Sequence, residues 1–275
     1  MARTNMTATR LKPETSELLT LRVLRRTPVT PHMVRVTLGD GDVERFRPMG
    51  FDQWFRLFVP VSAGSLARLP QRLNATAYLR YLTISKTERP VLRNYSVRAY
   101  HADGPQGPEL DVDFVLHGSA EGGTAGPAAT WAATCAPGDA VAIIDEGISF
   151  NPPADVERLL LVADETGLPA VSGILESLPE DAGGQAVVEV PSAADVQDLV
   201  APPGVEVSWV LRTDPRAVPG QAALAAVTSA PLPDEPFYGW VVGEQSLPTG
   251  LRRHWVRGGV PKENIMFCGY WRAGR

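Results

Sequence analysis

The chain has 275 residues, which is long enough for two modest domains that each bury a core. Hydrophobic residues make up 44% and charged residues 21% of it, and no apolar run approaches the ~20 residues that a membrane span requires. The formal net charge of −5 argues against general nucleic-acid binding, which depends on clustered Lys and Arg.

The cysteines and histidines argue against a structural metal. Two cysteines, Cys135 and Cys268, cannot form a disulfide framework or a zinc site, and the four histidines lack metal-ligand spacing. We therefore expect no protein-bound metal and a reducing, cytoplasmic location. Residues 1–17 have scattered charge without the apolar centre of a secretory signal, so we expect them to form a disordered leader.

The first half of the chain, residues 18–150, consists of short strand patterns separated by turns. Candidate strands lie at residues 21–24, 33–38, 54–59, 110–116 and 139–145. The clearest is 110–116, where apolar residues alternate with Asp111 and Asp113. Strands at this spacing predict an antiparallel β-barrel. Residues 62–90 interrupt the pattern, and we expect an insertion there that is helical around residues 66–73.

The second half, residues 154–275, alternates strand and helix patterns. Residues 158–163 are a continuous apolar run, typical of a strand buried on both faces. Further strands are expected at 186–190, 205–210, 237–242 and 265–268, and helices at 168–178, 192–200 and 251–256. This alternation predicts a Rossmann-like α/β domain with a parallel sheet.

The second half contains neither G-x-G-x-x-G nor a Walker loop. Its first strand instead runs into Asp164-Glu165-Thr166-Gly167-Leu168-Pro169. Ligands of open α/β sheets bind outside the carboxyl ends of the strands, near helix N-termini, so a phosphate or a nicotinamide could approach this turn. Taken alone, the segment is equally consistent with an ordinary turn that starts a helix.

The segment Arg93-Asn94-Tyr95-Ser96 fits a flavin site of the ferredoxin-reductase type. The aromatic ring can lie beside the isoalloxazine, the hydroxyl can bond its edge, and the Arg can reach an anionic pyrophosphate. An ordinary strand with a core Tyr would show the same four residues. Farther along, Gly126-Pro127 precedes a short helix whose free backbone N–H groups suit a diphosphate. The two segments together occur in the order of a flavin-binding barrel.

At this point the chain resembles the siderophore-interacting, FAD-binding protein family. The blocks that carry the resemblance, in order, are residues 52–60, 89–98, 111–118, 126–132, 163–170, 240–244 and 269–272. The resemblance implies a FAD-binding barrel over residues 18–150, followed by an NAD(P)H-binding domain over residues 154–275. It also implies that electrons pass from NAD(P)H through FAD to Fe(III) in a ferric siderophore, which releases Fe(II).

The family pattern assigns cofactor-binding roles to eleven residues. Those expected to hold the flavin ring are Arg93, Tyr95 and Ser96. Those expected near its ribityl chain and diphosphate are His117, Gly118, Ala128, Thr130 and Trp131. Those expected on the nicotinamide side are Asp164, Thr166 and Glu244.

Three features depart from that pattern. Ser96 stands where Thr is common, and it keeps the hydroxyl that the flavin needs. Gly167 stands where Ala is more usual, so the turn before the helix gains flexibility. Residues 119–125 form a slightly long segment next to the diphosphate loop.

A basic mouth would help capture an anionic siderophore. Arg56 occupies a family position where a basic residue is usual, and we expect Arg252 and Arg253 to join it across the domain cleft. Most surface arginines are instead solvated or in weak ion pairs. Arg212, after the third strand of the second half, is the candidate for a coenzyme 2′-phosphate, which favours NADPH slightly over NADH.

Two other functions fit the same sequence. One is a general flavin reductase that exchanges electrons with ferredoxin or another small acceptor. The other is a protein that binds a siderophore without turnover, although such a protein has no need of the flavin segments. Trp271, near the end of the chain, could shield the flavin or anchor the tail, and we expect an anchor.

Overall fold

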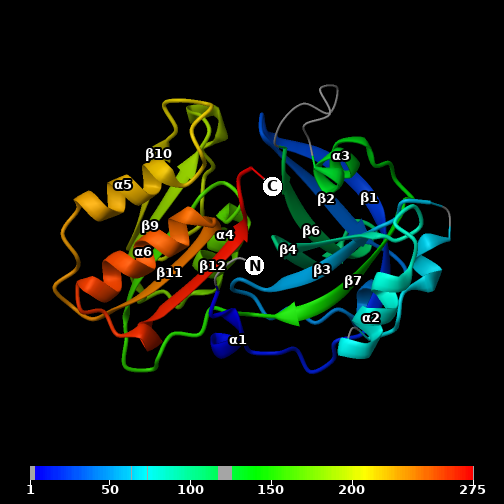
Figure 1. Cartoon of the computed structure of the whole chain (residues 1–275), viewed down its shortest axis with the longest axis horizontal. Coiled ribbons are helices and arrows are strands. Elements are labelled where there is room, and N and C mark those ends of the chain that lie inside the picture. Colours follow the sequence, from blue (N-terminus) through cyan, green and yellow to red (C-terminus); the bar gives the residue numbers. More distant parts are fainter. Residues whose placement is uncertain (1–3, 63, 73, 117–125, 275) are drawn as a thin grey trace. The chain divides into compact units, whose positions relative to one another are not determined.

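The computed structural model describes residues 4–62, 64–72, 74–116 and 126–274, and the chain divides into two compact units (Figure 1). The barrel unit comprises Lys12–Met49 and Gln53–Gly147. The α/β unit comprises Met1–Leu11, Gly50–Asp52 and Ile148–Arg275. The domain bounds expected from the sequence, 18–150 and 154–275, stay predictions.

The barrel unit is built on an antiparallel sheet of seven strands in the order β4-β3-β7-β1-β2-β6-β5, which confirms the predicted architecture. The strands are β1 (Leu18–Thr30), β2 (Met33–Gly39), β3 (Trp54–Val59), β4 (Val91–Ser96), β5 (Ala99–Gly104), β6 (Gly107–Val115) and β7 (Ala140–Gly147). The rings of Tyr95 on β4 and Phe114 on β6 lie 4.3 Å apart, which brings strands from opposite ends of the sheet order together. One short helix, α3 (Pro127–Thr134), packs near this point.

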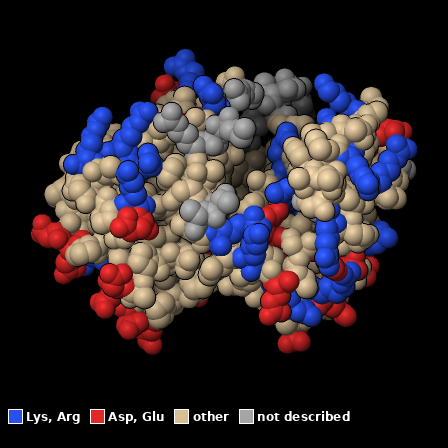
Figure 2. Space-filling model, turned by 60° about the horizontal axis from the view of Figure 1, so that its bottom comes forward, with Lys and Arg blue, Asp and Glu red and all other residues tan. Residues whose placement is uncertain are grey.

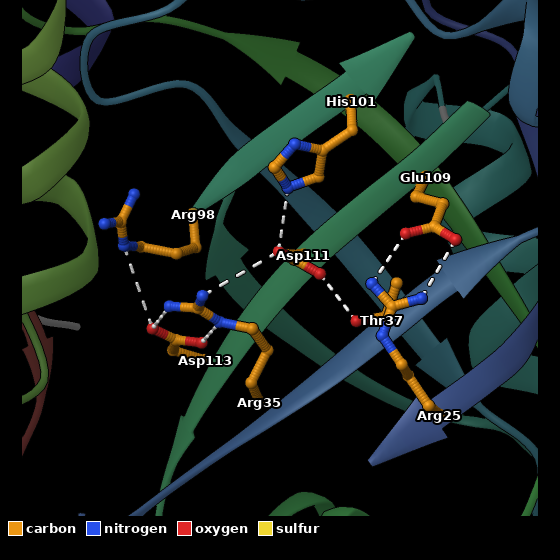
Figure 3. A network of polar contacts seen from close by, with 8 residues as sticks. All are labelled: Arg25, Arg35, Thr37, Arg98, His101, Glu109, Asp111 and Asp113. Atoms are coloured by element: carbon orange, nitrogen blue, oxygen red, sulfur yellow. Dashed lines mark hydrogen bonds and ion pairs between the residues drawn. The ribbon is translucent and has the colours of Figure 1, made fainter. Parts of the chain in front are cut away.

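The alternation along β6 separates an apolar face from a charged one. Leu110, Val112 and Phe114 join the apolar core of the unit. The carboxylates on the opposite face are also buried, and each has a cationic or hydroxyl partner (Figure 3). The pairs are Arg25–Glu109, Arg35–Asp111, Thr37–Asp111, His101–Asp111, Arg35–Asp113 and Arg98–Asp113. A buried carboxylate is tolerated because such partners replace its hydration.

The insertion between β3 and β4 differs from the expectation. Residues 65–68 form one 3-10 turn, and the α-helix, α2 (Ala75–Thr83), begins later than the predicted 66–73. Pro70 is unfavourable inside a helix, whereas the Asn74 side chain accepts a hydrogen bond from Ala77 N at 2.8 Å and caps the helix start. The buried face of α2 packs through Tyr81 onto Phe58, in a second small core on the outer side of the sheet.

The α/β unit contains a parallel sheet of five strands in the order β10-β9-β8-β11-β12, which confirms the predicted Rossmann-like layout. The strands are β8 (Arg158–Ala163), β9 (Gly183–Val190), β10 (Gly204–Leu211), β11 (Phe237–Glu244) and β12 (Ile265–Trp271). The α-helices that follow β8, β10 and β11 are α4 (Leu168–Ser177), α5 (Gln221–Ser229) and α6 (Ser246–Arg257). The chain runs outward from β8 to β10 and then returns to β11, so the switch point of the sheet lies between β8 and β11.

Two helices of this unit differ from the expectation. The predicted helix at 192–200 is wrong, because only Ala193–Asp195 forms a 3-10 turn. There the buried Asp195 carboxylate accepts a hydrogen bond from Ser192 Oγ at 2.7 Å, a local side-chain bond that competes with helix continuation. Helix α5 was not predicted, since its Ala-rich sequence carries little hydrophobic periodicity.

The described residues before Leu11 bond to the α/β unit, unlike the disordered leader that we expected. Helix α1 (Met6–Thr9) is preceded by Asn5, whose side chain donates to Ile265 O at 2.6 Å and accepts from Phe267 N at 2.9 Å. Leu11 exchanges two backbone hydrogen bonds with Ile148. The segment thus adds partners to β12 and to the segment after β7.

The helices in the described part of the chain are too short or too polar to span a membrane.

The buried carboxylate of Asp52 fastens three parts of the α/β unit together. Its Oδ1 accepts hydrogen bonds from Ser149 N and Phe150 N, both at 2.8 Å, and its Oδ2 accepts one from Trp240 Nε1 at 3.1 Å. Burial raises the pKa of Asp52, and these three donors oppose that rise. Asp52 therefore holds the residues that precede β8 against β11.

Replacing Asp52 with Ala should destabilise the α/β unit by about 2–4 kcal/mol, because it leaves three buried donors without an acceptor. Urea unfolding followed by tryptophan fluorescence measures the change. Asp198→Ala, at an exposed position of the same unit, is the matched control and should stay within about 0.5 kcal/mol of the parent. Equal unfolding midpoints for the two variants would contradict the role of Asp52.

Candidate cofactor site

Strand β4 presents the predicted flavin residues at an edge of the seven-stranded sheet. Arg93 and Asn94 are exposed, and Tyr95 and Ser96 are half-buried. The guanidinium of Arg93 bonds the carbonyl oxygen of Leu92 at 2.7 Å, and no carboxylate among the described residues forms a salt bridge with it. Arg93 thus keeps a cationic group on the surface, in reach of an anionic ligand.

Tyr95 belongs to a row of aromatic rings. Phe114 lies between it and Trp131 of α3, with ring centroids 4.3 Å and 5.6 Å away. Burial raises the pKa of Tyr95, so its phenol stays protonated at neutral pH. The row fixes the tyrosine ring in place, with Phe114 between it and Trp131 of α3. The structure thereby brings Tyr95 and Trp131 into one cluster, and their roles in binding a flavin stay predictions.

No side chain in the described part of the chain caps the N-terminus of α3. Its first intrahelical hydrogen bond runs from Thr130 N to Gly126 O at 2.9 Å, which leaves the N–H groups of Ala128 and Ala129 without a helical acceptor. Such groups, together with the helix dipole, suit a phosphate. His117 and Gly118, the other predicted diphosphate residues, lie outside the described part of the chain, as do residues 119–125.

A groove of about 730 Å³ lies beside Trp131. Its walls come from the start of β1, the start of β7 and the insertion; they include Leu18, Leu66, Leu69 and Asp139. The groove offers apolar walls with a few polar groups, the usual character of a small-molecule site. No group of three His, Cys, Asp or Glu side chains that could hold a metal ion occurs among the residues that the structure describes.

In the α/β unit, Asp164 joins the carboxyl ends of β8 and β11. Its Oδ1 accepts hydrogen bonds from Thr166 N at 2.9 Å and Thr166 Oγ1 at 2.5 Å, and its Oδ2 accepts one from Glu244 N at 2.6 Å. Burial, with the neighbouring Glu165 charge, raises the pKa of Asp164 to about 6. Because Asp164 is fully buried, it shapes the turn at the switch point, and the half-buried Thr166 is the residue left nearer to solvent.

Glu244 closes the next turn in a similar way. Its carboxylate accepts hydrogen bonds from Ser246 N and Ser246 Oγ on one oxygen and from Ala273 N at 3.2 Å on the other. Burial would raise the pKa of Glu244, but these hydrogen bonds outweigh it and lower the pKa. The three predicted nicotinamide residues, Asp164, Thr166 and Glu244, are therefore joined in one network around the ends of β8 and β11.

Arg212 lies between two carboxylates at the ends of β8 and β9. Its guanidinium bonds Glu165 Oε2 at 2.5 Å and Glu189 Oε1 at 2.9 Å, and only 7% of its side chain is exposed. Glu189 also accepts a hydrogen bond from Ala223 N in the first turn of α5. The sequence pointed to Arg212 as a phosphate ligand and missed both carboxylates. Their only signal was two acidic residues at the ends of consecutive apolar runs.

Two of the three arginines expected to bind a siderophore already contact other side chains of the protein. Arg56 on β3 bonds Glu146 Oε1 through its Nε at 2.6 Å. Arg252 on α6 lies over the ring of Phe267, 4.9 Å from its centroid, and Arg253 on the same helix is exposed. Trp271 is half-buried at the end of β12, where its carbonyl oxygen accepts a hydrogen bond from Gln245 N at 2.9 Å.

Gly167 allows α4 to start close to the sheet. A Cβ at this position would lie 2.4 Å from Val242 Cγ2 and 2.7 Å from Ala163 Cβ, so a side chain would push the helix away from β8 and β11. The sequence suggested that Gly167 makes the turn more flexible. The packing instead requires glycine for a close approach.

Gly167→Ala should therefore lower the free energy of unfolding of the α/β unit by about 1–3 kcal/mol, through overpacking next to β11. Gly126→Ala is the control, because a Cβ at Gly126 meets none of the described residues within 4 Å and the backbone there is extended. Thermal and urea unfolding would compare the two. If the Gly167→Ala protein is as stable as the parent, the turn can move to accept the methyl group without loss of stability, and the prediction is wrong.

Comparisons with known proteins agree with this geometry. Residues 22–149 match the model of the siderophore-interacting FAD-binding domain, and residues 156–274 match that of the siderophore-interacting protein. The ferric vibriobactin reductase ViuB of Vibrio cholerae is 30% identical over 93% of this chain and 89% of its own. The NADPH-dependent ferric-chelate reductase of Escherichia coli is 26% identical over 92% of each chain.

Among solved structures, a siderophore utilization protein from T. fusca superposes with a TM-score of 0.76 at 29% identity, over 97% of both chains. The ferredoxin reductase of carbazole 1,9a-dioxygenase, at 16% identity and a TM-score of 0.65, shares the fold. The two matched domains span nearly the whole chain in the order in which the structure displays its barrel and its parallel sheet. The chain belongs to the siderophore-interacting, FAD-binding family of proteins.

Proposed function

We propose that this protein is a cytoplasmic, FAD-containing reductase that uses a nicotinamide to reduce Fe(III) in a ferric siderophore and so releases Fe(II). The observation that carries the proposal is that Arg93, Tyr95 and Ser96 follow one another on β4 and that Tyr95 shares an aromatic row with Trp131 of α3. Bound FAD supplies the conversion of a two-electron hydride into single electrons. Fe(II) binds hard oxygen donors less strongly than Fe(III), so reduction loosens the siderophore complex.

The described residues fit FAD in charge and in shape. The diphosphate is anionic, and both the Arg93 guanidinium and the N–H groups of Ala128 and Ala129 offer it donors. Ser96 and the protonated Tyr95 suit the flavin ring, with Thr130 and Trp131 nearer to the diphosphate and the adenosine. The groove beside Trp131 has room for the adenosine end. His117 and Gly118 stay predicted members of the same set.

The hydrogen-bond network around Asp164 supports a nicotinamide-binding site in the α/β unit. Asp164 and Glu244 hold the ends of β8 and β11 at the switch point, and Thr166 offers a hydroxyl there. Ligands of open α/β sheets bind at this edge. The two carboxylates act as positioning residues, because both are buried and bonded to backbone N–H groups.

NADH, and not the NADPH that the sequence favoured, is the donor that we propose. Arg212 is already shared by Glu165 and Glu189, so the three side chains carry a formal charge of −1. A coenzyme 2′-phosphate near them would meet net repulsion, whereas a ribose hydroxyl carries no charge to repel. Arg216, the next cation along the chain, pairs with Asp214 and is 92% exposed.

Arg56, Arg252 and Arg253 remain the residues that we propose for binding an anionic siderophore. Glu146 holds the Arg56 guanidinium through Nε, which fixes its direction. On the face drawn in Figure 2, Lys and Arg side chains stand in several groups, while Asp and Glu gather mainly along the lower edge. Such local basic groups can attract an anion although the net charge is −5. The comparisons give no support to ferredoxin as a partner.

The purified protein should show a flavin spectrum that NADH bleaches anaerobically, and the colour should return on adding a ferric siderophore as a chelator traps Fe(II).

Arg93→Ala should weaken FAD binding about 10- to 100-fold, the loss expected for one charge-assisted hydrogen bond. Arg22→Ala, an exposed arginine of the same unit, is the control and should bind FAD normally. A protein that takes up no added FAD would refute the proposal.

The donor can be tested by binding alone. In calorimetric titrations of the FAD-loaded protein, ADP-ribose should bind at least about tenfold more tightly than its 2′-phosphorylated form. Glu165→Gln, which removes one negative charge beside Arg212, should narrow that ratio, and the exposed Glu206→Gln should not. Tighter binding of the 2′-phosphorylated form would overturn the choice of NADH and leave the reductase assignment standing.

A further inference from the structure

The insertion between β3 and β4 is strongly basic in an otherwise acidic protein. Residues 60–90, between β3 and β4, contain five Lys and Arg and a single Glu, a formal charge of +4, whereas the whole chain carries −5. Helix α2 lies within this segment, on the outer side of the barrel sheet (Figure 1). The insertion therefore carries positive charge that is separate in sequence from the β4 residues proposed to hold the flavin.

One face of α2 is apolar and exposed, and within the part of the chain that the structure describes only Tyr78 at its edge has a ring contact, a stack on Tyr81 with centroids 5.9 Å apart. Tyr78, Leu79 and Leu82 are 40%, 63% and 43% exposed, and Ala77 and Tyr81 on another face are buried. At 3.6 residues per turn, the three exposed side chains fall within an arc of about 100°. Large aliphatic side chains gathered in this way on a single helix are a mark of an interaction surface.

The barrel holds this helix in a fixed orientation. The Tyr81 hydroxyl donates a hydrogen bond to Pro90 O at 2.8 Å, and the Tyr81 ring packs edge-on against Phe58 at 5.8 Å. The Asn74 side chain caps the first turn. Because Tyr81 points into the sheet, the face with Leu79 and Leu82 points outward.

Three cations without a carboxylate partner among the described residues lie on α2 or shortly after it. Arg80 is on the helix, and Lys86 and Arg89 follow it. Arg89 donates to Leu82 O at 3.0 Å and lies 5.6 Å from the centroid of the Tyr81 ring, which keeps it beside the end of α2. The other insertion arginines differ, since Arg68 pairs with Glu88 and Arg72 with Glu17.

We propose that α2 docks the protein onto an anionic phospholipid surface. Tyr78, Leu79 and Leu82 enter the headgroup region, and Arg80, Lys86 and Arg89 bind lipid phosphates. A short helix with an apolar face flanked by cations is the pattern of a peripheral membrane anchor. The apolar face is a convex stripe on one helix, which suits a deformable lipid surface better than a groove-forming protein partner. The inference goes beyond the proposed reductase function and does not depend on it.

The test is flotation of the full chain with vesicles of phosphatidylcholine alone and with vesicles of equal amounts of phosphatidylcholine and phosphatidylglycerol. The protein should float with the anionic vesicles at low salt, and much less with neutral vesicles or at high salt. The double variant Leu79→Glu/Leu82→Glu should lose at least about tenfold in bound fraction, and so should Arg80→Glu/Lys86→Glu.

Val200→Glu is the matched control, because Val200 is 70% exposed and lies in the α/β unit. It should float like the parent, and circular dichroism should show that all variants are folded. Binding that is equal on neutral vesicles, or unchanged in both double variants, would overturn the proposal. No binding to either vesicle would also overturn it. A dimer in light scattering that Leu79→Glu/Leu82→Glu dissociates would assign the face to a second copy of the chain.

Discussion

The carboxylate of Asp164 is the constraint on which the α/β unit depends. It receives hydrogen bonds from the turn after β8 and from the end of β11, the two strands on either side of the switch point. Gly243, with a φ of 133°, leaves room for it, since a Cβ there would lie 2.6 Å from the carboxylate. Gly167 then lets α4 start directly over the sheet. One buried charge thus sets the shape of the edge where a nicotinamide is proposed to bind.

The barrel unit solves the problem of buried charge differently. Strand β6 carries three carboxylates on the face opposite its apolar core, and each is paired with side chains from neighbouring strands. Removing one member would leave an uncompensated charge in a region with little water. The array therefore restricts which strands can lie beside β6, and in doing so it supports β4, whose Tyr95 packs against Phe114 of β6.

Arginines in this protein fall into two groups by what their guanidinium meets. Arg212 and Arg35 form ion pairs with buried carboxylates, and these pairs stabilise the folded structure. Arg93 and Arg80 meet no described carboxylate and stay on the surface, one on the strand proposed to hold FAD and the other on α2. The distinction bears on function, because only the second group can neutralise an external phosphate without first giving up an internal partner.

The sequence by itself determined the barrel and the parallel sheet, because periodicity within a strand reports which faces are buried. It also predicted that Tyr95 and Trp131 belong to one site, since the family blocks retain their order. It could not determine the partners of Arg212, which lie 47 and 23 residues away and meet it only when β8, β9 and β10 align. For the same reason the sequence did not predict where α2 starts, or that residues 192–200 form no α-helix. At both places a single side-chain hydrogen bond determines the local structure. Only the tertiary structure decided which charged side chains form internal ion pairs and which stay available to a ligand, because the partners of a charged side chain are often distant in the chain.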